Sequence, residues 1–144
     1  MKKRASVFII IGLFSFISAC KDSRSQEVII SSVNAAFEPS GNNENKTLLV
    51  VSSADCGNCF VTELEEFLKT EKLDATLVVS FEERKAKELD KKVIDLLTEN
   101  AIPVFKKESL SLLVEIGKYS GSPKSPYILR YGNRNLQIES LVRH

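Results

Sequence analysis

Two cysteines three positions apart are the residues of this chain best suited to chemistry. Cys56 and Cys59 enclose a Gly-Asn spacer and follow an apolar run, residues 47–52, at the point where an amphipathic helix pattern begins at Phe60. Two thiols at this spacing can pass between a dithiol and a disulfide, and so exchange two electrons with a partner. The sequence therefore predicts a redox-active pair in a strand-to-helix turn.

The place of each cysteine in this turn predicts its role. Thiol–disulfide exchange requires a thiolate, and the unpaired N–H groups at a helix N-terminus stabilise an anion. We expect Cys56 to lie at that position and to act as the nucleophile. Cys59, one turn further along the helix and more buried, would then resolve the mixed disulfide. The carboxylate of Asp55, the residue before Cys56, opposes formation of the thiolate.

The elements that would position this pair alternate between strands and helices. Strands are predicted at 48–52, 75–81, 102–105, 127–131 and 136–142, and helices at 57–70, about 83–100 and 109–116. The last two strands would form a hairpin, residues 28–33 a short edge strand, and residues 38–45 a loop. We expect the charges at 82–100, including the pairs Glu83/Lys87 and Glu88/Lys92, to form a solvated helix face. This alternation predicts an α/β fold with a mostly parallel central sheet, helices on both faces and a C-terminal β-hairpin.

The N-terminus has the pattern of a bacterial lipoprotein signal. Three basic residues at positions 2–4 precede an apolar stretch at 7–17, which is shorter than the roughly 20 residues that a membrane-spanning helix needs. The tetrapeptide at 17–20 resembles a lipobox, which implies that Cys20 is lipidated. Residues 1–19 would then be a signal peptide, 20–46 a lipidated cysteine with an N-terminal extension that is a polar tether at 21–27, and 47–144 the folded domain. The alternatives are an ordinary secretory signal and an uncleaved anchor.

The expected mature chain is nearly neutral. The full sequence has 20 Lys and Arg against 19 Asp and Glu, and loss of residues 1–19 removes three basic residues and no acidic one, which leaves a net charge of −2. Binding to phosphates needs a basic field that this composition lacks, so we expect no nucleic-acid partner. The rest of the chain is long enough for one domain with its own core.

The order of these features resembles the thioredoxin-like superfamily. A strand, then Cys56 and Cys59 at the start of a helix, and much later Ser125-Pro126 at the entrance to a strand of the last hairpin together span residues 46–142. The additional helix and strand between residues 82 and 105 make the chain most similar to membrane-tethered thiol-disulfide oxidoreductases of the redoxin type. This resemblance implies that Pro126 is a cis-proline facing the cysteines. It also implies that the backbone of Ser125 pairs with an extended substrate segment.

The resemblance implies an enzyme of the cell envelope that is lipid-anchored, faces the periplasm or the exterior, and exchanges disulfides with protein dithiols and disulfides. It implies no cofactor, and we expect a monomer. The Gly-Asn spacer differs from the Gly-Pro of thioredoxin, so a reduction potential cannot be carried over. Val50 stands where thioredoxin has a buried aspartate, so Glu63 or Asp55 would have to assist proton transfer to Cys59.

Two other functions fit a cysteine pair. A binding or assembly module with this fold would keep Cys56 and Cys59 as a permanent structural disulfide, although so short a loop contributes little entropic stabilisation. A metal site, or delivery of a metal by a chaperone, needs further ligands. Outside the pair, only Cys20 and His144 supply the Cys or His that structural zinc prefers. We therefore expect no metal.

Overall fold

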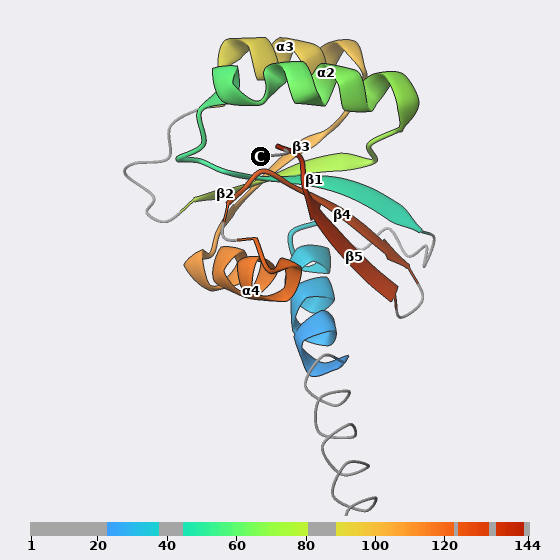
Figure 1. Ribbon diagram of the computed structural model, residues 1–144, viewed down its shortest axis with the longest axis vertical. Helices are drawn as coiled ribbons and strands as arrows, with labels where there is room; N and C mark the ends of the chain where they lie inside the picture. The colour runs from blue at the N-terminus through green and yellow to red at the C-terminus, as the bar shows by residue number, and fades with distance from the viewer. Residues whose placement is uncertain (1–22, 38–44, 81–88, 123, 133–134, 143–144) are drawn as a thin grey trace, which may run out of the picture.

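Five strands form one sheet with the order β3-β2-β1-β4-β5 in the computed structural model, which describes residues 23–37, 45–80, 89–122, 124–132 and 135–142 (Figure 1). The strands are β1 (Lys46–Ser52), β2 (Ala75–Ser80), β3 (Val104–Glu108), β4 (Tyr127–Gly132) and β5 (Asn135–Ser140). β2 runs parallel to both β1 and β3, whereas β4 runs antiparallel to both β1 and β5. The chain is therefore an α/β protein with a mixed sheet.

The expectation of a mostly parallel sheet is wrong, and the path of the chain through the last helix, α4 (Leu110–Ser120), explains why. The N–H of Ser109 donates to the carbonyl of Ser80, so α4 begins at the edge of the sheet where the parallel strands end. α4 does not carry the chain back to the opposite edge, because Tyr127 at the start of β4 pairs with Val50 near the end of β1. β4 must therefore run against β1.

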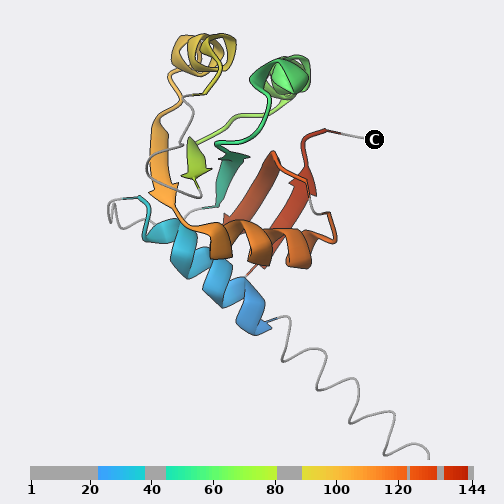
Figure 2. The ribbon, with the colours of Figure 1, turned by 90° about the vertical axis from the view of Figure 1, so that its left-hand side faces the viewer.

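Helices cover both faces of the sheet, as Figure 2 shows. α2 (Val61–Thr70) and α3 (Lys91–Glu99) lie on one face, and α4 and a helix at residues 23–34 lie on the other. Alternate side chains of β1 enter two separate cores, Leu48 and Val50 on the α4 side and Leu49 and Val51 on the α2 side. The predictions of helices on both faces and of a C-terminal hairpin, formed by β4 and β5, are confirmed.

The segment 28–33, expected as an edge strand, is part of the helix at 23–34. Ile29 and Val33, four residues apart, are 0% and 1% exposed and pack into the core on the α4 side. Burial of one helix face outweighs the preference of Ile and Val for strands. The expected polar tether is also helical from residue 23 on, and Gln26 donates a hydrogen bond to the phenol oxygen of Tyr119. Within the described part of the chain, no helix has the length and apolar character needed to cross a bilayer.

The remaining elements match the predictions with shifted boundaries. β1 begins two residues earlier than expected, β3 runs two to three residues later, and α4 extends four residues further. α4 ends at Gly121, whose positive φ of 70° turns the chain towards β4. α3 begins only at Lys91, where the carboxylate of Asp90 caps the helix by accepting from the N–H of Lys92. The residues expected to begin this helix, with the pairs Glu83/Lys87 and Glu88/Lys92, lie outside the described residues, as does most of the expected loop at 38–45.

Candidate functional site

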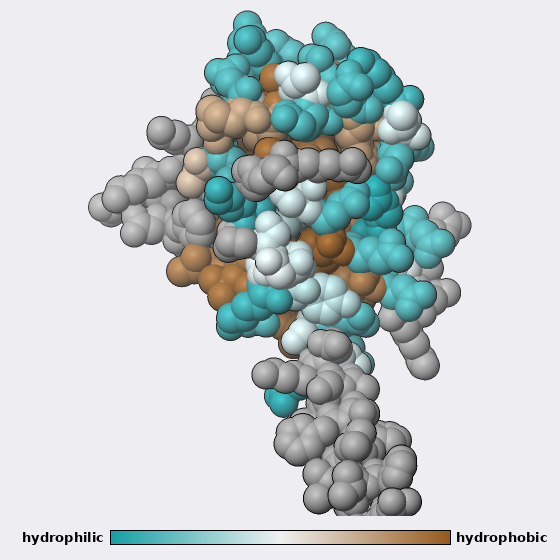
Figure 3. Space-filling model, in the orientation of Figure 1, coloured by the Kyte–Doolittle hydropathy of each residue, from teal (hydrophilic) through white to brown (hydrophobic). Residues whose placement is uncertain are grey.

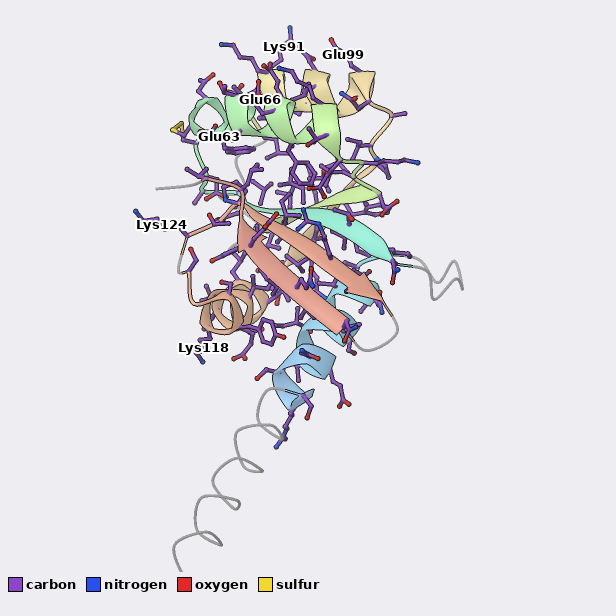
Figure 4. All side chains as sticks on the ribbon, turned by 45° about the vertical axis from the view of Figure 1, so that its right-hand side comes forward. Glu63, Glu66, Lys91, Glu99, Lys118 and Lys124 are labelled. Atoms are coloured by element: carbon purple, nitrogen blue, oxygen red, sulfur yellow. A yellow bond between two sulfur atoms is a disulfide. The ribbon has the colours of Figure 1, made fainter. Side chains whose placement is uncertain are left out.

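Cys56 and Cys59 lie in the turn that follows β1. Gly57–Cys59 form a short 3-10 helix, and the N–H of Cys59 donates to the carbonyl of Cys56 at 2.9 Å. The two Cα atoms are 5.2 Å apart, and the sulfur atoms are joined as a disulfide at the outer end of the turn (Figure 4). The cysteine pair predicted from the sequence is therefore present at the end of the central strand.

The prediction that Cys59 lies on the α-helix and is more buried is wrong. α2 begins at Val61, and both cysteines are exposed. Phe60, the residue between Cys59 and α2, is 1% exposed and fills the core beneath α2. Because Phe60 takes the inward position, the preceding tight turn stays at the surface, where both sulfur atoms are open to a partner.

Asp55 connects this turn to a second one. One carboxylate oxygen accepts a hydrogen bond from the N–H of Ser52 at 2.9 Å, and the other accepts one from the hydroxyl of Ser125 at 2.8 Å. Burial raises the pKa of Asp55 above its usual value, while the bonds from Ser125 and Ser52 act in the opposite direction. The residue before Cys56 is thus fixed to the turn that precedes β4.

Ser125 and Pro126 form that second turn. The peptide bond between them is cis, which confirms the conformation implied by the resemblance. Pro126 is buried, and its carbonyl accepts a hydrogen bond from the N–H of Leu141 at 2.9 Å. Ser125 is half-buried, and its bond to Asp55 joins residues 70 positions apart. The structure therefore brings this turn beside the residue that precedes Cys56.

Tyr127 follows the cis-proline and faces the same carboxylate. Its hydroxyl donates to the carbonyl of Ser122 at 2.8 Å. Burial raises the pKa of Tyr127, and the negative charge of Asp55 raises it further. A neutral phenol and a half-buried carboxyl group thus share the space between β1 and β4.

An open groove of about 550 Å³ extends from Ser125 along α4. Ser52 and Tyr127 line its end at the sheet, and Leu110 and Val114 of α4, which are 57% and 44% exposed, line its outer part. Figure 3 shows hydrophobic surface over α4 in this region. The groove is mainly apolar, with Lys118 as the charged residue among its lining.

The remaining candidates take no visible part in this site. Glu63, considered for proton transfer, lies in the first turn of α2 and projects from it (Figure 4), and Val50 is fully buried. Cys20 and His144 lie outside the described residues. Within the described residues, no group of three or more His, Cys, Asp or Glu side chains is placed to hold a metal ion.

Comparison of the chain with protein-family models, with curated proteins and with solved structures finds no match. The assignment of a function therefore rests on the geometry of the site itself.

Sequence reasoning identified the cysteines and the Ser125-Pro126 turn, but it missed the bond between Ser125 and Asp55. It treated Asp55 as a charge next to Cys56, because a partner 70 residues away leaves no trace in local spacing. It also missed the groove, since the apolar residues at 110 and 114 have the spacing of an ordinary buried helix face.

Proposed function

We propose that this protein is a thiol-disulfide oxidoreductase of thioredoxin-like fold that exchanges disulfides with protein partners. The observation that carries the proposal is the exposed Cys56–Cys59 pair at the end of the central parallel strand, beside a cis-proline turn. Exposure matters because exchange requires one sulfur to be attacked by, or to attack, a sulfur of another protein.

The exchange proceeds in two balanced steps. In the reducing direction, the Cys56 thiolate attacks one sulfur of a partner disulfide, the partner's S–S bond breaks, and one partner thiolate leaves. The Cys59 thiolate then attacks the Cys56 sulfur, which forms the Cys56–Cys59 disulfide and releases the second partner thiolate. Two electrons pass to the partner, and a dithiol donor must restore the pair. The reverse sequence oxidises a partner dithiol.

The turn before β4 supports binding of the partner. Ser125 lies within one hydrogen bond of the residue that precedes Cys56, so a chain docked along Ser125 would have its sulfur close to the reactive pair. The apolar groove along α4 opens from the same residue, so the flanking residues of such a chain would also find a surface to contact.

The location proposed for the protein is the cell envelope. The lipobox-like sequence at 17–20 supports lipidation of Cys20, and a lipidated domain would face the periplasm or the exterior as a monomer. Disulfide exchange suits that setting, because extracytoplasmic compartments maintain protein disulfides.

The deciding experiment is the reduction potential of the Cys56–Cys59 pair, measured by equilibration with glutathione and dithiothreitol buffers. A potential near about −270 mV would indicate a reductase, and one near about −120 mV an oxidant of exported proteins. A pair that stays oxidised below about −300 mV would instead indicate a structural disulfide, and the binding-module alternative would replace the enzyme.

A further inference from the structure

The side chain of Asp55 is the link between the turn that bears Cys56 and the turn that bears Pro126. One carboxylate oxygen is bonded to the backbone of its own turn, at Ser52, and the other to the hydroxyl of Ser125. We propose that Asp55 is a positioning residue that clamps these two turns together, so that a partner chain bound along Ser125 presents its sulfur to Cys56. This role rests on the proposed function, because it concerns the alignment of a partner with the reactive pair.

A carboxylate suits this position better than a neutral side chain. It offers two acceptor oxygens, and here each oxygen receives one donor. Bonds to an ionised acceptor are stronger than those between neutral groups, and half-burial shields them from competing water. The clamp therefore holds most firmly when Asp55 is ionised.

The groups around Asp55 come from three elements. The end of β1 contributes the Ser52 N–H, the turn before β4 contributes the Ser125 hydroxyl, and the titratable neighbours are the phenol of Tyr127 and the adjacent Cys56 thiol. Tyr127 is neutral across the acid range, because its pKa is raised above 10.0. A change in the reactivity of Cys56 at acid pH therefore reports on Asp55.

Four substitutions separate the clamp from the charge. Ser125→Ala removes the bond between the turns, and Ser125→Thr restores a hydroxyl. Asp55→Asn removes the charge but keeps both contacts, because its oxygen can accept from Ser52 and its amide can donate to the hydroxyl of Ser125. Asp55→Ala removes the charge and both contacts. Ser31→Ala, an exposed site on the helix at 23–34, serves as the matched control.

The first measurement uses the reduced full-length chain carrying Cys20→Ser, so that Cys56 and Cys59 are its only thiols. The rate of reaction with dithiodipyridine, a disulfide that reacts with thiols at acid pH, is recorded against pH. We expect the wild-type rate to show an inflection from Asp55 below the inflection of the thiol itself. Ser125→Ala should move that inflection to higher pH, because the Ser125 bond lowers the pKa of Asp55. Ser125→Thr should move it back, and Asp55→Asn should abolish it. A wild-type profile without this inflection, or one that Ser125→Ala leaves unchanged, would overturn the clamp.

The second measurement is the rate of reduction of the insulin disulfides by the same variants. Ser125→Ala and Asp55→Ala should each slow it about fivefold, the ratio expected for one lost hydrogen bond. Ser125→Thr should recover most of the rate, and Asp55→Asn should stay faster than Asp55→Ala. Equal rates in Ser125→Ala, Asp55→Ala and the Ser31→Ala control would contradict the clamp. A wild-type protein that shows the pH inflection but never exchanges disulfides would keep the contact between the two turns and refute the proposed function instead.

Discussion

Gln26 and Tyr119, 93 residues apart, share a hydrogen bond in which the amide of Gln26 donates to the phenol oxygen. The same phenol donates to the carbonyl of Leu136 in β5. At the other end of the helix at 23–34, the ammonium group of Lys107 in β3 donates to the carbonyl of Ser32. The helix is thus fixed at both ends to the face of the sheet that α4 also covers.

Ile29→Ala should destabilise the protein by about 3 kcal/mol, because it removes a fully buried side chain from the core and leaves a cavity. Val28→Ala, at the neighbouring position with 48% exposure, should change the free energy of unfolding by less than about 0.5 kcal/mol. Urea unfolding of both variants checks the difference. Two equally small effects would show that the helix does not contribute to the folded core in solution.

Cys56→Ala should abolish disulfide exchange with proteins, because it removes the attacking thiolate. Cys59→Ala should instead accumulate partners as mixed disulfides, because the resolving thiol is missing. Non-reducing gels of the two variants, each in a Cys20→Ser background, distinguish these outcomes. Exchange at the wild-type rate in Cys56→Ala would remove this residue from the role of nucleophile.

Cys20→Ser should release the protein from the membrane fraction and prevent incorporation of labelled fatty acid. The substitution changes one atom of the side chain but removes the thiol that lipidation requires. Ser18→Ala, two residues earlier, keeps the cysteine and should retain the label. Labelled fatty acid in the Cys20→Ser protein would place the modification elsewhere in the chain.

Asp55→Asn should change the pH dependence of stability in a defined direction. Burial raises the pKa of Asp55 in the folded protein above 3.8, so the folded state binds the proton more tightly than the unfolded state. The stability that this proton confers is present below the ordinary pKa and is lost as the pH rises through the raised value. The stability of the wild type relative to Asp55→Asn should therefore fall with rising pH across this window, which urea unfolding at several pH values measures. A difference that grows with pH would reverse the assigned direction of the shift.

Arg130→Ala should cost about 1 kcal/mol of stability, because the guanidinium group pairs in bidentate fashion with Glu71 and also with Glu139. The guanidinium also lies 5.7 Å from the centre of the Phe67 ring, so β4, β5 and the end of α2 share this contact. Lys69→Ala, which breaks an exposed pair with Glu66, should have almost no effect. Thermal unfolding of the two variants gives the comparison, and equal shifts would reduce the Arg130 cluster to an ordinary surface pair.

The sequence predicts the parts of the fold in which local pattern and burial agree. β1, β2 and the hairpin of β4 and β5 follow from apolar runs and turn residues, and the cysteine pair follows from its place after a buried strand. The helix at 23–34 was misread because Val28, Ile29 and Ile30 favour strands, whereas the contact of Ile29 and Val33 with the sheet decides for a helix. The direction of β4 depends on how α4 crosses the sheet, which no local pattern encodes.

The helix at 23–34 also has a consequence for where the site lies above a membrane. Cys20 precedes the helix by three residues, which reach at most about 10 Å even when fully extended. In Figure 1 the helix begins at the lower end of the described chain, and in Figure 4 the disulfide lies in the upper half. With a lipid at Cys20, the helix would act as a rigid stalk rather than a flexible leash. The height of the reactive sulfurs above the bilayer would be nearly constant, so only partners whose disulfides reach that height could be served.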